Sequence, residues 1–168
     1  LLALRAQLKD QLEQPEPLPS LNDFIVKACA LALRRHPRAN GSYRDGRFEW
    51  HEHVNVGIAV AAADALIVPT IADADTRSVG AIAREARRLA AAVRDGSVTP
   101  RDLSGATFTV SNLGMYGIKD FTAIINPPQT TILAVGVGEE RAVDRSVVAR
   151  ERHRHDPRRL DLAGVDHV

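Results

Sequence analysis

The sequence has little of what several large classes of protein need. It holds a single cysteine, Cys29, so no disulfide can form within the chain, which fits a reducing compartment. Only 4% of the residues are aromatic and the net charge is +1, which disfavours base stacking and electrostatic binding of nucleic acid or anionic membranes. No apolar run approaches the roughly 20 residues that span a bilayer, and no signal segment opens the chain. We therefore expect a soluble, cytoplasmic domain with neither nucleic acid nor membrane as a partner.

Several catalytic and metal-binding motifs are also missing. There is no phosphate-binding loop, no GxGxxG after a strand, no HExxH and no GxSxG serine elbow. His51 and His53 in "HEH" are potential metal ligands, but no CxxC or further cluster completes a site, so we expect no metal. Cys29 lies in an apolar helical segment and is interpreted as a buried, unreactive thiol. His36, at the end of that segment, is interpreted as structural.

The chain does contain interleaved helical and strand patterns, which predict one α/β domain. Three segments have helical apolar spacing, at residues 1–14, 21–35 and 77–96, and the second is apolar on most sides, so it is expected to be well buried. The expected caps and stops of the second and third helices are Ser20 with Asp23 as a capping box, Pro37, Ser78 and Gly96.

Strand patterns fill most of the remaining chain. Residues 41–50 predict a hairpin that turns at Asp45-Gly46. The alternating segment 53–62 predicts a strand, and the continuous apolar segment 65–71 predicts one buried on both faces. Further strands are expected at residues 104–114, 119–128 and 130–138, with a strand pair at 141–150.

The stretch "VSNLGMYGIKDFTAIINPPQ", residues 110–129, holds the one catalytic candidate that spacing supports. Ser111 stands at the end of a predicted strand, followed by Gly114 and Gly117, which would let a substrate approach the backbone. A hydroxyl there could donate to an oxygen that becomes charged in a reaction, a role that needs position but no adjacent base. The alternative is a strand-end hydroxyl that only satisfies its own backbone.

The residues around Ser111 resemble a known family. "FTVSNLGMYGIKDFTAIINPPQTTILAVG" closely resembles the catalytic core of the dihydrolipoamide acyltransferases of 2-oxo acid dehydrogenase complexes, and it is most similar to those of pyruvate dehydrogenase. "LLALRAQLK", "LNDFIVKACALALRRHPRANGSY", "VNVGIAVAAADALIVPTIADAD" and "LSGATFTVSNLG" resemble successive parts of the same domain. The resemblance covers residues 1–143.

This resemblance implies a fold like that of chloramphenicol acetyltransferase, a mixed sheet flanked by helices, in homotrimers that build a larger core assembly. In the family the active site lies in a channel between subunits, which coenzyme A enters as a substrate from one end and the lipoyl arm from the other. The lipoyl domains that supply lipoamide lie upstream of this domain and are expected outside this chain. The implied partners are the lipoyl domains and the decarboxylase and dihydrolipoamide dehydrogenase components.

The chemistry of the family implies roles for two residues. A thiol with a pKa of about 8.5 is mostly protonated at neutral pH, so a general base must take its proton. In the family this base is the histidine of an H-x-x-x-D-G motif near the C-terminus. By position, Ser111 matches the family serine that stabilises the tetrahedral oxyanion. His167 in "AGVDHV" is the candidate for the base, and His153 and His155 are weaker candidates.

The C-terminal region departs from the family pattern. The H-x-x-x-D-G motif is missing, and a charge-rich stretch, residues 150–161, stands where an apolar strand should precede it. We interpret residues 1–149 as a catalytic core that is incomplete at both ends, because the chain also starts without methionine. Residues 150–168 are interpreted as an atypical charged tail, either truncated, disordered or out of frame after about Ala149.

Three functions are consistent with these residues. The first is transfer of an acyl group, acetyl by resemblance, between dihydrolipoamide and coenzyme A. The second is a catalytically silent core or fragment of the same family that lacks its base. The third is acetylation of a hydroxyl acceptor, as in chloramphenicol acetyltransferase, which the wording of "SNLGMYGIKDFTAIINPP" disfavours.

Overall fold

A computed structural model describes residues 2–11, 18–63 and 65–139 of the chain. Its centre is a four-stranded mixed sheet in the order β6-β3-β7-β8. The strands are β3 (Val56–Ile58), β6 (Thr70–Ile71), β7 (Phe108–Asn112) and β8 (Ile132–Val135). β7 is parallel to both β3 and β8, whereas β6 is antiparallel to β3. The mixed sheet expected from the sequence is therefore confirmed.

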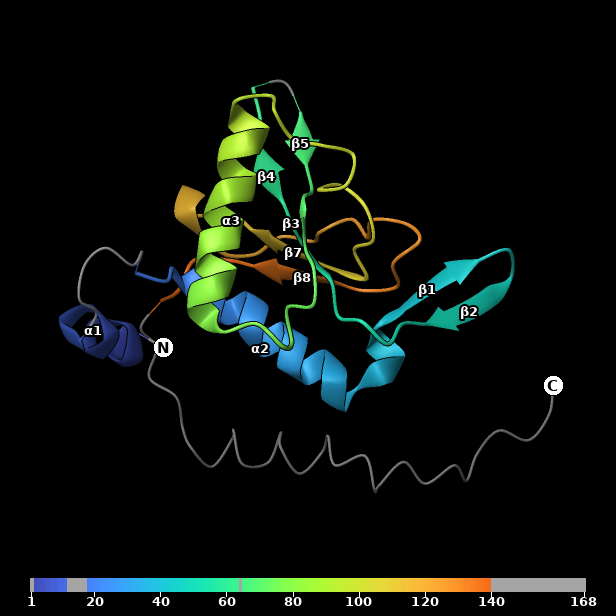
Figure 1. Cartoon of the computed structure of the whole chain (residues 1–168), viewed down its shortest axis with the longest axis horizontal. Coiled ribbons are helices and arrows are strands. Elements are labelled where there is room, and N and C mark those ends of the chain that lie inside the picture. Colours follow the sequence, from blue (N-terminus) through green and yellow to red (C-terminus); the bar gives the residue numbers. More distant parts are fainter. Residues whose placement is uncertain (1, 12–17, 64, 140–168) are drawn as a thin grey trace. The chain divides into compact units, whose positions relative to one another are not determined.

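Two of the three described helices pack against this sheet to form the core. The helices are α1 (Leu2–Gln11), α2 (Leu21–Arg35) and α3 (Val79–Arg94), with short 3-10 turns η1 (Pro37–Ala39) and η2 (Gly114–Tyr116). Figure 1 shows α3 in front of strands β3, β7 and β8, with α2 crossing below it. The core joins apolar side chains of α2, α3 and the facing strands: Val26, Ala30, Leu33, Ile82, Leu89, Val56, Ile58, Ile71, Phe108 and Val110. These elements lie in a compact unit that ends at Val137, and the second unit of the chain is described only at residues 138–139.

Local sequence signals set the ends of the helices as predicted. The Ser20 side chain accepts a hydrogen bond from the Asp23 N–H, and Asp23 accepts in return from the Ser20 backbone, which completes the capping box of α2. The Ser78 side chain caps α3 by accepting from the Ala81 N–H. Both caps are therefore confirmed. The prediction that α2 is buried on most sides is wrong, because Leu21 and Leu31 are exposed and only one face enters the core.

The predicted hairpin is also confirmed. β1 (Gly41–Arg44) pairs with β2 (Arg47–Trp50) in antiparallel register. Asp45 and Gly46 both have positive φ, 49° and 78°, as the two central residues of a tight hairpin turn require. The hairpin extends to the right in Figure 1.

Two strand predictions are wrong, for reasons of tertiary pairing. Residues 65–71 do not form one buried strand. They form β5 (Leu66–Ile67), which pairs with β4 (Val60–Ala61), and then β6, which pairs with β3. Pro69 separates them, and it has no N–H to continue a ladder. Leu66 is 68% exposed, so this part of the apolar run is not core.

Residues 119–128 form no strand either, although their apolar run resembles one. Ile124 is 91% exposed, and no strand of the described chain pairs with this segment. The segment is instead an irregular connection between η2 and β8. The strand pair predicted at residues 141–150, and the tail from 150 onward, lie outside the described residues.

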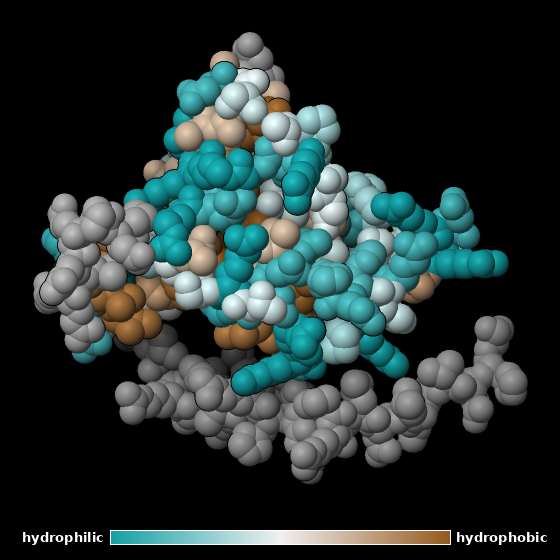
Figure 2. Space-filling view, viewed as in Figure 1, coloured by the Kyte–Doolittle hydropathy of each residue, from teal (hydrophilic) through white to brown (hydrophobic). Residues whose placement is uncertain are grey.

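The face that α3 presents is mostly hydrophilic (Figure 2). Its exposed residues include Arg84, Arg87, Arg88 and Arg94, whereas Ile82 and Leu89 on the opposite side of the helix are fully buried. Amphipathic spacing thus orients α3 on the sheet. Within the described ranges, no helix has both the length and the apolar content needed to cross a bilayer.

Candidate functional site

Strand β7 and the residue just before it carry a row of three hydroxyl groups on one face. Side chains alternate along a strand, so Phe108 and Val110 point into the core with the helices, and Thr107, Thr109 and Ser111 share the opposite face. Because β7 lies between β3 and β8, the backbone that carries this row is held on both sides up to Val110.

The first two hydroxyls of the row are fully used inside the fold. The Thr107 Oγ1 hydroxyl donates to Asn40 Oδ1 at 2.6 Å, and the Thr109 Oγ1 hydroxyl donates to Gln129 Oε1 at 2.6 Å. Both threonines are buried. Each is therefore a structural hydroxyl that satisfies a buried amide oxygen.

The third hydroxyl, on Ser111, differs from the other two. Ser111 is half-buried, and its hydroxyl has no hydrogen-bond partner among the residues the structure describes. Its backbone pairs with β8 opposite Ala134, so the residue is held in place while its side chain is left free. The described chain thus does not use this hydroxyl to satisfy its own backbone. The alternative of a purely structural strand-end hydroxyl is therefore not supported.

Ser111 lies in the wall of a cavity of about 600 Å³, here called the Ser111 cavity. This volume is in the range of small-molecule sites. The wall combines the first turn of α2, one side of α3, the β4–β5 strands and η2, and it is apolar apart from a few polar groups. Arg87 and Arg94 of α3 supply positive charge, and Arg87 Nη2 also donates to the Leu18 carbonyl at 2.8 Å.

The turn that follows Ser111 is packed tightly against the end of β8. The Leu113 N–H donates to the Val135 carbonyl at 3.0 Å. A Cβ on Gly114 would come within 2.8 Å of the Gly136 carbonyl oxygen, so only glycine fits there. A Cβ on Gly136 would in turn collide with the Lys119 carbonyl. These two glycines allow the backbones to approach closely where β7 ends.

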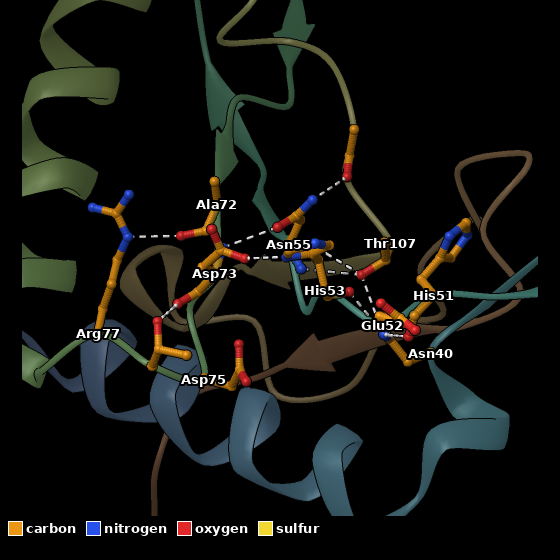
Figure 3. A network of polar contacts seen from close by, with 12 residues as sticks. Asn40, His51, Glu52, His53, Asn55, Ala72, Asp73, Asp75, Arg77 and Thr107 are labelled. Atoms are coloured by element: carbon orange, nitrogen blue, oxygen red, sulfur yellow. Dashed lines mark hydrogen bonds and ion pairs between the residues drawn. The ribbon is translucent and has the colours of Figure 1, made fainter.

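The second cavity, here called the His51 cavity, has a volume of about 350 Å³ and holds the histidines noted in the sequence. Ser42 Oγ and His51 Nε2 are 2.7 Å apart, which is the spacing of a nucleophile and its base. Ser42 is only 2% exposed, however, so its hydroxyl is enclosed. The Asn40 Nδ2 group donates to the backbone carbonyls of both His51 and His53, each at 2.9 Å (Figure 3). We interpret this cluster as a structural network.

His53 forms an ion pair at the surface of this network. Its Nδ1 lies 2.7 Å from Asp73 Oδ1, and the hydrogen bond and charge of that carboxylate raise the pKa of His53. In the parts of the chain that the structure describes, no three His, Cys, Asp or Glu side chains gather as metal ligands would. Cys29 is half-buried against the core, and burial raises the pKa of its thiol, which disfavours the reactive thiolate.

The other histidines have simple outcomes. His36 is exposed at the end of α2, where its backbone N–H donates to the Ala32 and Leu33 carbonyls, in agreement with a structural position. His153, His155 and His167 lie outside the described residues, so the structure brings none of them to Ser111.

One pair of residues at this site is not predicted by the sequence. Asn112 and Asn22 are hydrogen-bonded to each other across 90 positions of the chain, and both line the Ser111 cavity. The only local signal was an asparagine beside the serine at a strand end, a residue type common in turns, and nothing near it pointed to the start of α2.

Comparisons with known proteins agree with this geometry. A model of the family described as "2-oxoacid dehydrogenases acyltransferase (catalytic domain)" matches residues 1–154. The dihydrolipoyllysine-residue acetyltransferase component of pyruvate dehydrogenase complex from Rhizobium meliloti (strain 1021) is 43% identical over 150 residues, covering 87% of this chain and 34% of that protein. The chain thus spans about one third of that curated relative.

Two solved structures share the fold. Azotobacter vinelandii dihydrolipoamide acetyltransferase, studied for the roles of a serine, a histidine and an asparagine in its catalytic mechanism, superposes with a TM-score of 0.82 at 32% identity, over 86% of this chain and 60% of that chain. The cubic core of a pyruvate dehydrogenase multienzyme complex matches with the same TM-score of 0.82, at 32% identity and 86% and 60% coverage. The fold expected from the sequence, that of chloramphenicol acetyltransferase, is confirmed by these acyltransferase cores.

Proposed function

The chain belongs to the 2-oxoacid dehydrogenase acyltransferase (catalytic domain) family, and we propose that it transfers an acyl group between dihydrolipoamide and coenzyme A. The observation that carries the proposal is the Ser111 hydroxyl. It stands in a cavity wall on a rigid strand, with no hydrogen-bond partner among the described residues, whereas the threonines beside it are fully bonded. A fixed, unused donor is what stabilisation of a developing oxyanion requires.

In the proposed reaction a general base removes the proton from the attacking thiol, and the thiolate adds to the thioester carbonyl. The carbonyl oxygen becomes an oxyanion, to which the Ser111 hydroxyl donates a hydrogen bond. When the tetrahedral intermediate collapses, the carbon–sulfur bond of the original thioester breaks, and the departing thiolate takes the proton back from the base. No covalent bond to the protein forms, which agrees with the lack of a serine elbow in the sequence.

The proposed base is His167, with His153 and His155 as the next candidates. All three lie beyond the described residues, and the proposal for His167 rests on the Asp166-His167 pair at the end of the sequence. In this role the imidazole accepts the thiol proton at neutral pH, where a histidine of ordinary pKa is mostly unprotonated.

The finer assignments are part of the same proposal. Acetyl is the proposed acyl group, because the similar Rhizobium meliloti protein is named as an acetyltransferase component of pyruvate dehydrogenase complex. Coenzyme A is a substrate, and lipoamide is delivered by a lipoyl domain outside this chain. The chain works as a homotrimer within a larger core, together with the decarboxylase and dihydrolipoamide dehydrogenase components, in the cytoplasm. The match to a cubic pyruvate dehydrogenase core supports the assembly.

The test is an assay of acetyl transfer from acetyl-CoA to free dihydrolipoamide by the purified chain. We expect Ser111→Ala to lower kcat by about 100-fold to 1,000-fold, the usual loss of one oxyanion donor. We expect His167→Ala to abolish most activity. A loss in Ser111→Ala alone would move the base to His153 or His155, which are replaced next.

A second candidate function is favoured by the missing H-x-x-x-D-G motif. In that case the chain is a catalytically silent core with the family fold and no base. The same assay separates the two, because a silent core shows no transfer in the parent chain, while its mass in solution still reports the trimer.

A further inference from the structure

Two asparagine side chains join the end of β7 to the first turn of α2. Asn112 Nδ2 donates to Asn22 Oδ1 at 3.1 Å, and Asn112 Oδ1 accepts from the Gly114 N–H at 2.9 Å. A backbone N–H can only donate, so the oxygen of the Asn112 amide must face Gly114 and its nitrogen must face Asn22. Both ends of the Asn112 amide are therefore engaged, one in the turn and one across the cavity wall.

The partner of Asn112 is itself held firmly. Asn22 lies between the two residues of the capping box, in which the Asp23 carboxylate accepts from the Ser20 N–H and from the Ser20 hydroxyl, both at 2.7 Å. The next residues of α2, Phe24 and Val26, are buried in the core. Asn22 thus presents its oxygen from a helix start that cannot shift easily.

The strand end needs such a restraint on one side. The parallel ladder between β3 and β7 ends at the pair Ile58 and Val110. Beyond it, Ser111 and Asn112 pair only with β8, opposite Ala134 and Val135. In the described part of the chain, the bond from Asn112 to Asn22 is the polar link that holds this end of β7 toward the helices.

We propose that Asn22 is a positioning residue for Ser111: through Asn112 it holds the end of β7, so that the Ser111 hydroxyl stays aimed at the reacting carbonyl. This inference rests on the proposed acyl transfer. It assigns no chemical step to either asparagine. Its consequence is kinetic, because an oxyanion donor acts only from the position that the oxyanion will occupy, and a displacement of about 1 Å can lower a rate by about 100-fold.

The test substitutes Asn22, which holds Asn112, and leaves Ser111 unchanged. Asn22→Ala removes the acceptor, and Asn22→Asp keeps an oxygen for Asn112 and suits the start of a helix. In the transfer assay on the full chain, we expect Asn22→Ala to lower kcat by about tenfold with KM nearly unchanged. Asn22→Asp should remain within about twofold of the parent, because it restores a hydrogen bond of the same kind.

A double variant separates positioning from a general loss of structure. If Asn22 acts through Ser111, the effect of Asn22→Ala on kcat disappears when Ser111→Ala is already present. Equal effects in both backgrounds would overturn the proposal, as would a change confined to KM or a failure of Asn22→Asp to restore the rate.

The chain offers a matched control in Asn55. This asparagine also joins distant backbone segments, since its Nδ2 donates to the Gly105 carbonyl at 2.8 Å and its Oδ1 accepts from the Asp73 N–H at 2.9 Å. It lies at the His51 cavity. We expect Asn55→Ala to lower Tm but to leave kcat unchanged below the transition. A kcat loss in Asn55→Ala equal to that in Asn22→Ala would refute a specific link to Ser111.

Amide hydrogen exchange tests this inference without any enzyme assay, so its failure can be told apart from failure of the proposed function. If the parent chain shows no acyl transfer, the functional proposal fails, and hydrogen exchange of the amides from Ser111 to Gly114 decides the link alone. Exchange there should quicken by about tenfold in Asn22→Ala and not in Asn22→Asp or Asn55→Ala. Unchanged exchange in Asn22→Ala would show that the bond to Asn112 does not hold the strand end.

Discussion

The two cavities contrast in how they use polar groups. The His51 cavity contains the residue types usually sought at an active site, a serine 2.7 Å from a histidine, yet its buried polar side chains, those of Ser42, Thr107 and Gln129, are each hydrogen-bonded to another side chain. The Ser111 cavity is more apolar and contains no histidine among the described residues, yet it presents a hydroxyl without a partner. A half-buried donor that folding leaves unused is the stronger sign of function, because folding normally satisfies such groups.

The contrast lies within a few residues of the chain. Thr107, just before β7, borders the His51 cavity, and Ser111, four residues or about 13 Å further along the same face, borders the other. A proton acceptor must come within about 3 Å of the group it serves. The geometry therefore gives the histidines of the His51 cavity a structural role, and chemistry at Ser111 needs a base from elsewhere in the chain or in the assembly.

Removal of the unpaired Ser111 hydroxyl is expected to give the largest difference between the two cavities. Ser111→Ala should lower kcat by about 100-fold to 1,000-fold while changing the free energy of unfolding by less than about 0.5 kcal/mol, because no described bond is lost. Steady-state kinetics and urea unfolding of the same preparation measure both. A large loss of stability instead would mean that the hydroxyl is structural and would erase the contrast.

Thr107, at the other end of the row of hydroxyls, is expected to affect stability and not kcat. Thr107→Val keeps the shape of the side chain but leaves Asn40 Oδ1 without its donor at 2.6 Å and the Asn55 N–H without its acceptor at 3.1 Å. We expect unfolding to become easier by about 2 kcal/mol, with kcat unchanged below the transition. Ser111→Ala is the matched control, since it deletes a hydroxyl from the same face. A kcat loss in Thr107→Val comparable to that of Ser111→Ala would contradict the division between the cavities.

Crowding of the backbone near the Ser111 turn gives a smaller effect. In Gly136→Ala the new Cβ would meet the Lys119 carbonyl, and its carbon lies at 2.8 Å, so the backbone must shift. We expect a loss of about 1 to 3 kcal/mol in the free energy of unfolding, measured in urea, as for overpacked sites. Gly138→Ala is the control, because no atom lies within 4 Å of the Cβ it would add. Equal stability of the two variants would show that this close approach is easily relieved.

The sequence predicted well where a local signal decides the structure. The Ser20 and Ser78 caps and the Asp45-Gly46 turn depend on residues within a few positions of one another, and each forms as expected. Predictions failed where a strand forms only if a distant strand pairs with it. Residues 65–71 and 119–128 both contain an apolar run, but a strand exists only where another strand pairs with it, and the local sequence does not show whether such a partner is present.

The candidate site shows the same division. Ser111 could be singled out because a hydroxyl at a strand end before two glycines is a local pattern, and a family resemblance surrounds it. The bond between Asn22 and Asn112 could not be, because it joins positions 90 residues apart and depends on how α2 packs on the sheet. Whether a side chain is left unpaired is likewise a property of the whole fold, since it depends on which neighbours the packing brings.

The smallest expected effect concerns the exposed edge of the His51 cavity and its dependence on pH. Asp73 raises the pKa of His53 in the folded chain, so the pair stabilises the fold fully at a pH below the unfolded value of about 6.5, and this contribution is lost as pH rises through the folded pKa. His53→Ala should therefore lower Tm slightly at pH 5.5 and leave it unchanged at pH 9. His36→Ala, which removes an exposed histidine outside this network, is the control. The Tm values at both pH values are measured by thermal scans. The kcat of acyl transfer should not change in either histidine variant. A Tm difference for His53→Ala that grows toward pH 9 would contradict this expectation. It would show that the neutral imidazole of His53, and not its ion pair with Asp73, stabilises the network. His53 would then be grouped with the hydrogen-bonded residues inside the cavity and not with its exposed edge.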